Sequence, residues 1–312
     1  MGVASGTDAI TIALEALEIG PGAEVVTAAN TCVPTIAGIE ASGATAVLAD
    51  VELATGTLDP GRLEEALTAR TRAIVPVHLY GQCAELEPIL ALAESRGLAV
   101  VEDCAQAHGA LYHGAPAGSL GAAGAFSFYP TKNLGALGDG GAVTTDDAAL
   151  AERARLLRNY GEQERFTHVI KGRNSRLDAL QAACLSAKLP FLEERNGRRR
   201  AIAARYDEAL EGTDTEAPVE SEGRRHAYHL YVVRSPRRDE LRARLAERRI
   251  ETAVHYPLPI HHQPAYRDLA PAGRTLAASE ALAAQIMSAP LHPSLSDEEA
   301  GYVAAALAES SR

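Results

Sequence analysis

Cysteine and lysine are both scarce in this sequence. The four cysteines are Cys32, Cys83, Cys104 and Cys184, widely spaced and without a CxxC pair. Such spacing argues against a cysteine-based metal site, and a disulfide framework is not expected in a chain of 312 residues. We therefore expect reduced thiols, a cytoplasmic protein and no metal site.

Long apolar runs and an excess of positive charge are also missing. No run reaches the roughly 18 apolar residues of a membrane helix, and the first residues lack the basic and apolar parts of a signal peptide. The net charge of −11 argues against a nucleic-acid binder. It leaves room for an anionic small substrate, which local positive groups can hold in an acidic protein.

Up to about residue 145, apolar strand-like segments alternate with helix-like segments. We expect strands at residues 24–29, 44–51, 73–79, 98–103, 125–129 and 141–145. We expect helices at residues 10–17, 59–69, 85–96 and 147–160. Apolar strands separated by helices predict an α/β fold with a mostly parallel sheet covered on both faces.

The rest of the chain follows another pattern. One long, arginine-rich helix is expected over residues 177–210, followed by a loop at residues 211–225. The remaining elements are expected to be a strand at residues 226–234 and helices at residues 237–248, 275–287 and 296–309. This pattern favours a smaller α+β domain, and we place the two domains at residues 1–190 and 191–312.

Lys132 lies in the stretch FSFYPTKNLGALGDGGA, which begins at Phe126. Pro130 and the glycines exclude a helix, so this lysine would lie on a rigid loop just after a strand. A desolvated lysine amine loses its proton readily and can form an imine. An isolated lysine would more often be a solvated surface residue, but the motifs around it favour the imine.

Asp103, in the stretch VEDCAQAHG, ends an expected strand. Ligands of α/β folds bind at the carboxyl ends of parallel strands. The Asp103 carboxylate could pair with a protonated pyridine nitrogen and make that ring an electron sink, and Gln106 could reach the ring hydroxyl. The alternative for Asp103 is a plain helix cap.

A phosphate site is predicted where the stretch ASGTDA opens a helix. Small residues such as Gly6 and Thr7 let the backbone approach a phosphate, which the helix N-terminus then binds. Ser127, five residues before Lys132, could add its hydroxyl. Plain helix capping is the alternative.

Together these stretches resemble the DegT/DnrJ/EryC1/StrS family of sugar aminotransferases. The matching segments are GVASGTDAI, PVHLYGQ, VEDCAQAHGA, FSFYPTKNLGALGDGGA, LRNYG, NSRLDALQAA and HYPLPIHHQ. The resemblance covers essentially the whole chain. It implies the fold type I of enzymes that depend on pyridoxal 5′-phosphate (PLP).

The resemblance also implies roles for single residues. Lys132 would form the imine with PLP, Asp103 would bind the pyridine nitrogen and Gln106 would contact the ring. The phosphate ligands would be Gly6, Thr7, Ser127 and, from the neighbouring subunit, Asn174. That last role implies a homodimer with shared active sites.

Two departures from the family pattern stand out. Members of the family usually carry a leading segment before the SGTDA motif, and we expect that segment to be missing here. They often have an aromatic residue stacked on the cofactor where this chain has Cys32.

Several histidines are harder to interpret. His108 could orient the cofactor or substrate, or it could be a packed, hydrogen-bonded histidine. His255, Tyr256, His261 and His262 suggest a metal at first, but the intervening prolines prevent helical ligand spacing and we expect no carboxylate to join them. By resemblance, His255, Tyr256 and His261 lie near the nucleotide-sugar.

The predicted activity is amino transfer from glutamate to a nucleotide-linked keto-sugar. The segments HLYG, AQAHGA and HYPLPIHHQ look most like those of enzymes that act on dTDP-3-keto-6-deoxyhexoses, so C-3 amination is the first choice and C-4 amination the second. Lys132 argues against the family's dehydratase branch, which carries histidine there. Two further interpretations are a PLP-binding regulator without catalysis and an inactive paralogue.

Overall fold

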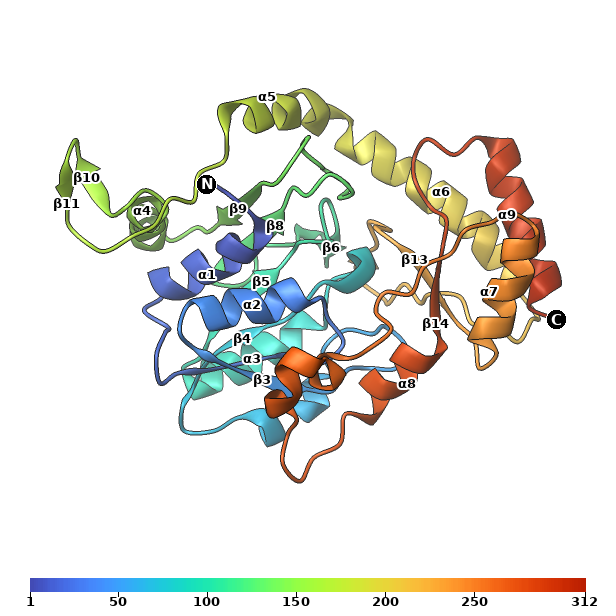
Figure 1. Cartoon of the computed structure of the whole chain (residues 1–312), viewed down its shortest axis with the longest axis horizontal. Helices are drawn as coiled ribbons and strands as arrows, with labels where there is room; N and C mark the ends of the chain where they lie inside the picture. Colours follow the sequence, from blue (N-terminus) through green and yellow to red (C-terminus); the bar gives the residue numbers. More distant parts are fainter.

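The computed structural model describes residues 1–312 and is built around a seven-stranded sheet (Figure 1). Its strands are β1 (Gly2–Val3), β2 (Glu24–Ala28), β3 (Thr45–Ala49), β4 (Thr71–Val75), β5 (Ala99–Asp103), β8 (Ala123–Ser127) and β9 (Gly141–Thr144). They lie in the order β1-β9-β8-β5-β4-β2-β3. All neighbours from β8 to β3 are parallel, whereas β9 is antiparallel to both β8 and β1. The expected mostly parallel sheet is confirmed.

Helices cover both faces of this sheet. They are α1 (Gly6–Ala16), α2 (Val33–Ala41), α3 (Leu86–Arg96) and α4 (Ala148–Leu157). Val25 of β2 packs into a core shared with α1, α2 and α4. The next residue, Val26, packs on the opposite face with Ile89 of α3. This alternation explains why the strands are apolar at consecutive positions.

A second core forms in the C-terminal part of the chain. Its elements are α6 (Leu192–Leu210), β13 (Tyr231–Arg234), α7 (Arg238–Glu247), β14 (Ile286–Ala289) and α9 (Asp297–Ser310). Strands β13 and β14 pair antiparallel, and the buried rings of Tyr206 and Tyr231 meet edge to face at 5.1 Å. Figure 1 shows α6 running toward α7 and α9, with α4 at the other end of the molecule.

The long helix expected over residues 177–210 is broken. The structure has α5 (Ala179–Lys188), a 3-10 turn at Leu189–Phe191, and then α6. Pro190 lies in that turn, where it cannot donate a helical hydrogen bond. We propose to keep the domain boundary at residues 190–191, where this break separates the helices.

Three further expectations are corrected. Residues 59–69 form two short 3-10 turns, Pro60–Arg62 and Glu64–Ala66, although Asp59 does accept a hydrogen bond from the Gly61 N–H as a cap. Of the strand expected over residues 226–234, only Tyr231–Arg234 forms a strand, which is β13. The helix expected over residues 275–287 is α8 (Ala277–Gln285), after which the chain turns into β14.

Small sheets complete the fold. They are formed by β6 (Leu111–Tyr112), β7 (Ala115–Pro116), β10 (Glu162–Glu164), β11 (Thr167–His168) and β12 (Arg224–Arg225). The β10–β11 hairpin projects from the end of the molecule next to α4 (Figure 1). None of the helices is both long and apolar enough to span a bilayer.

Candidate active site

A cavity of about 330 Å³ lies where β5 and β8 end and α1 begins. Six predicted cofactor residues line it: Gly6, Thr7, Asp103, Gln106, Ser127 and Lys132. This volume is at the lower end of the range for small-molecule sites. Segments nearly 130 positions apart in the sequence thus converge on one cavity.

The Asp103 carboxylate is held at the end of β5. Its Oδ1 accepts the Ala105 N–H at 3.0 Å, and its Oδ2 accepts the Thr35 hydroxyl at 2.8 Å. Only 4% of Asp103 is exposed. Thr35 lies in α2 and was not singled out from the sequence; only the packing of α2 brings it to Asp103.

Lys132 is half-buried, and its side chain lines the same cavity. Burial lowers the pKa of Lys132, and the nearby Asp103 and Cys32 offset only part of that effect. A lowered pKa leaves more of the amine unprotonated, as imine formation requires. Lys132 therefore lies on the loop after β8, as expected, and its role as the imine lysine stays a prediction.

The start of α1 also lines the cavity. The Ser5 hydroxyl caps the helix by accepting the Asp8 N–H at 3.1 Å. Gly6 is needed at this position because a Cβ there would lie 2.6 Å from the Ser127 Cβ. This close approach places the Ser127 hydroxyl beside the free N–H groups of the first helical turn, an arrangement suited to a phosphate.

Gln106 is held by two hydrogen bonds in the cavity wall. Its Oε1 accepts the Tyr80 N–H at 2.7 Å, and its Nε2 donates to the Tyr256 hydroxyl at 3.1 Å. Burial raises the pKa of Tyr256 above its usual value, so its hydroxyl stays protonated. Tyr256 and Tyr80 thus contact Gln106 from behind the residues that line the cavity, and the expected role of Tyr256 near the nucleotide-sugar stays a prediction.

The other residues of the histidine-rich loop separate in space. The ring of His255 hydrogen-bonds the Ser288 hydroxyl at 2.8 Å, and burial and then nearby Lys132 lower the pKa of His255. His261 does not line the cavity; its Nε2 lies 3.1 Å from Glu280 Oε1. The view that no carboxylate joins these histidines is therefore wrong, because α8 brings Glu280 to both His261 and His262.

His108 and Asn174 are the two remaining residues that the sequence singled out. His108 is buried against the rings of Phe126 and Phe128, as a packed histidine would be, with the Ser127 backbone as its polar neighbour. Burial, followed by Lys132, lowers the pKa of His108 to about 3. Asn174 is exposed and outside the cavity.

Cys32 lines the cavity at the N-terminus of α2. Burial raises the pKa of its thiol. A protonated thiol has no ring to stack on a cofactor, so Cys32 can offer only a small apolar contact there.

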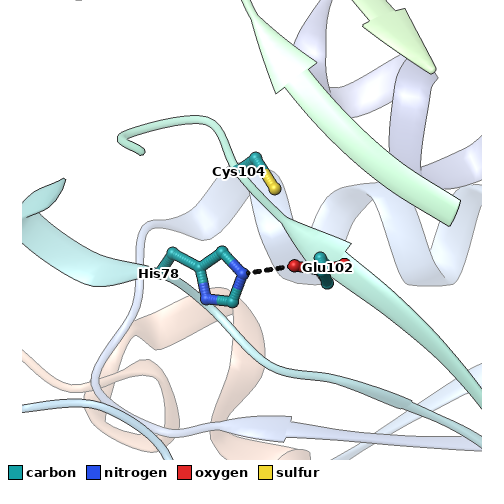
Figure 2. A group of neighbouring side chains, drawn as sticks. All are labelled: His78, Glu102 and Cys104. Carbon is teal, nitrogen blue, oxygen red and sulfur yellow. Dashed lines mark hydrogen bonds and ion pairs between the residues drawn. The ribbon is translucent and has the colours of Figure 1, made fainter. Parts of the chain in front are cut away.

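Figure 2 shows another titratable group, formed by His78, Glu102 and Cys104. The His78 Nδ1 accepts the Ala84 N–H at 3.1 Å, so its Nε2 carries the proton and donates to Glu102 at 2.9 Å. The Glu102 carboxylate also accepts the N–H groups of Gly118, Leu120 and Gly121. This carboxylate is saturated with donors, and we assign it a structural role.

Comparison with known proteins supports the same chemistry. Residues 1–308 match the DegT/DnrJ/EryC1/StrS aminotransferase family. The chain is 47% identical over 310 residues to a dTDP-3-amino-3,4,6-trideoxy-alpha-D-glucose transaminase of Streptomyces venezuelae, covering 99% of this chain and 82% of that protein. It is 46% identical over 312 residues to a "Pleiotropic regulatory protein" of Geobacillus stearothermophilus, covering 99% of this chain and 84% of that protein.

Solved structures extend the similarity to three dimensions. DesV of S. venezuelae in complex with a ketimine intermediate superimposes with a TM-score of 0.97 at 47% identity, covering 100% of this chain and 85% of that chain. The PLP form of the putative sugar aminotransferase Spr1654 from Streptococcus pneumoniae gives a TM-score of 0.92 at 26% identity, covering 100% and 86%. The cavity fits PLP, because it offers an amine, a buried carboxylate and a helix N-terminus suited to a phosphate around one space.

Proposed function

Since the chain belongs to the DegT/DnrJ/EryC1/StrS aminotransferase family, we propose that it transfers the amino group of glutamate to C-3 of a dTDP-linked 3-keto-6-deoxyhexose. The protein is a PLP-dependent transaminase of nucleotide-linked sugars. The proposal for C-3 is carried by the S. venezuelae relative, whose name places the amino group at that carbon. Other relatives are named for UDP-linked and GDP-linked sugars, so the nucleotide has to be tested.

In this proposal each residue of the cavity has a defined task. When bound, PLP supplies the ring that takes up the electron pair released at the substrate carbon. The Asp103 carboxylate holds the proton on the ring nitrogen, and Gly6, Thr7 and Ser127 bind the phosphate. The Lys132 Nζ takes the proton from the α-carbon of glutamate and later delivers a proton to C-3 of the sugar.

A regulatory function is the second candidate, because relatives at 46% and 45% identity are named as a regulatory and a sensory transduction protein. Catalysis is favoured by Lys132, which lines the cavity and whose amine has a lowered pKa, as a reactive amine needs. Amination at C-4 remains the alternative within catalysis.

All four cysteines are unpaired, which supports the proposed cytoplasmic location.

The test of this function uses substrate panels. The purified protein, loaded with PLP, is incubated with glutamate and separately with dTDP-, UDP- and GDP-linked keto-sugars, and the product is identified by mass spectrometry and NMR. We expect an amine at C-3 of the dTDP-sugar. An amine at C-4, or turnover of the UDP-sugar alone, would replace the proposed substrate.

A second measurement tests the role of Lys132 directly. Borohydride reduction should fix the cofactor on the peptide that contains Lys132 and on neither other lysine. Labelling elsewhere, or none in a folded, PLP-saturated sample, would remove Lys132 from the mechanism.

A further inference from the structure

Two buried asparagines connect the Lys132 loop with the turn that follows Asp103. Asn133 is the neighbour of Lys132 in the chain and is 8% exposed, and Asn196 of α6 is fully buried. The Asn133 Nδ2 donates to Asn196 Oδ1 at 2.9 Å. The Asn196 Nδ2 in turn donates to the backbone oxygen of His108 at 2.7 Å. The two segments that carry Lys132 and Asp103 are thus attached to one point of α6.

His229 extends this network beyond α6. Its Nδ1 lies 3.1 Å from Asn133 Oδ1, and the Asn133 Nδ2 also donates to the Ala227 oxygen at 2.9 Å. The ring of His229 is buried close to Lys132: burial and then Lys132 hold the pKa of His229 well below its usual range. The Arg199 guanidinium of α6 donates to the backbone oxygen of His229 at 3.2 Å, which anchors this segment.

The hydrogen bonds determine which way each side chain faces. A backbone oxygen only accepts, so the His108 oxygen requires the NH₂ group of Asn196. Asn196 Oδ1 then faces the NH₂ group of Asn133, whose second hydrogen is taken by the Ala227 oxygen. Asn133 Oδ1 is left to accept, so His229 must carry its proton on Nδ1 and leave Nε2 bare.

Gly109 packs tightly against Asn196. A Cβ on Gly109 would lie 2.7 Å from the Asn196 Nδ2, and Gly109 has a positive φ of 80°. Only glycine lets the turn after Asp103 approach Asn196 this closely. A buried network in which the NH₂ group and the oxygen of both asparagines are hydrogen-bonded specifies one arrangement of its residues.

We propose that Asn133, Asn196 and His229 are positioning residues that fix the Lys132 amine relative to the Asp103 carboxylate, with His229 acting as its Nδ1–H tautomer. This inference rests on the proposed roles of Lys132 and Asp103. A purely structural role would affect stability, whereas positioning affects the ionisation and the reactivity of Lys132.

The matched pair His229→Asn and His229→Gln separates these roles. The amide of asparagine lies near the position of the imidazole Nδ1, so H229N retains a donor to Asn133 Oδ1. The longer glutamine places its amide near the Nε2 position and loses that donor. We expect H229N to retain most of the wild-type kcat and H229Q to lose roughly tenfold to a hundredfold, with little change in KM.

The decisive measurement is spectroscopic. The pKa of the imine on Lys132 is read from the pH dependence of its absorbance, with thermal unfolding followed in parallel. The proposal expects this pKa to shift in H229Q and to stay near wild type in H229N. Equal imine pKa values in two folded variants would overturn it; if H229Q does not fold, an unshifted pKa in Asn196→Ala would do so.

The wild-type control keeps the two hypotheses apart. Wild-type protein that borohydride does not label at Lys132 contradicts the proposed function itself. Protein that is labelled, but in which the two His229 variants behave alike, contradicts only the positioning role.

Discussion

Each carboxylate oxygen of Asp103 accepts one hydrogen bond from the protein, and each can accept another. We expect Asp103→Asn to keep PLP bound through the phosphate contacts and Lys132, because those do not involve the carboxylate. The amide cannot supply the negative charge that holds the ring-nitrogen proton, so transamination should fall at least about a hundredfold. Single-turnover absorbance with glutamate measures this step.

Thr35→Val is the matched control for this variant. It removes the hydroxyl that donates to Asp103 Oδ2 but leaves the charge in place, and should cost much less than D103N. If D103N reacts at a near-wild-type rate, Asp103 is only a cap of the following turn.

The pH dependence of stability should depend on another single residue, Glu102. Burial alone would raise the pKa of Glu102, but the His78 ring N–H and the N–H groups of Gly118 and Gly121 bind the ionised form and lower the pKa below its usual 4.5. The unfolded chain then binds the proton more readily, so this stabilisation is present above about pH 4.5 and is lost as the pH falls through the folded-state value.

The variant Glu102→Gln tests this prediction. Its amide would leave N–H donors facing an NH₂ group, so it should be less stable at neutral pH by roughly 1–3 kcal/mol and lose less stability on acidification. Urea unfolding from pH 7 to about pH 3 measures both effects, with the exposed Glu87→Gln as control. Parallel pH curves for wild type and E102Q would rule out the assignment.

At the scale of elements, α8 begins without a cap of its own. Its N-cap residue Leu276 offers no side-chain acceptor, but Asp50, just after β3, accepts the N–H groups of Ala278 and Ser279 at 2.9 Å each. We expect Asp50→Ala to lower the free energy of unfolding by about 1–2 kcal/mol, since it leaves these donors unpaired.

Asp59→Ala provides the comparison in the same urea experiment. Asp59 caps the exposed Pro60–Arg62 turn with one bond to the Gly61 N–H at 2.8 Å, and its loss should cost clearly less. Equal costs would mean that the Asp50 contacts do not hold α8.

The sequence predicted the central strands well because each is an apolar run bounded by turn residues, as Val25 and Val26 illustrate on opposite faces. It missed α2, because the interior Gly38 disfavours a helix, although Pro34 lies in the first turn, where proline is tolerated. Gly38 is needed because a Cβ there would lie 2.9 Å from Ile10 of α1, a contact only the folded chain reveals. Asn133 and His229 were missed for the same reason, since their hydrogen bonds join residues 96 positions apart.

For the molecule as a whole, exposed apolar side chains around α5 favour a homodimer. Leu180 is 64% exposed, Leu189 55% and Phe191 50%. Asn174 is exposed just before this helix, as a residue serving a partner's site would be. We therefore keep the prediction of a homodimer with shared active sites.

Subunit mixing tests this prediction. Lys132→Ala and Asn174→Ala subunits should each be weakly active alone, and a heterodimer of the two should have one intact site. After random exchange, activity should recover to about a quarter of the wild-type value, because half of the dimers are mixed. No recovery with heterodimers demonstrated by mass spectrometry would mean that each subunit builds its own site.

The antiparallel pairing of β1 with β9 has a consequence for the order of assembly in time. Gly2 pairs with Ala142 and Val3 with Gly141, whereas β2, β3, β4 and β5 all lie within the first 103 residues. On the ribosome the parallel strands can therefore associate early, but the helix start at Gly6 reaches its final place only after β9 has emerged. We therefore expect the phosphate end of the cavity to be completed late, so that PLP assists the last stages of folding and not the first.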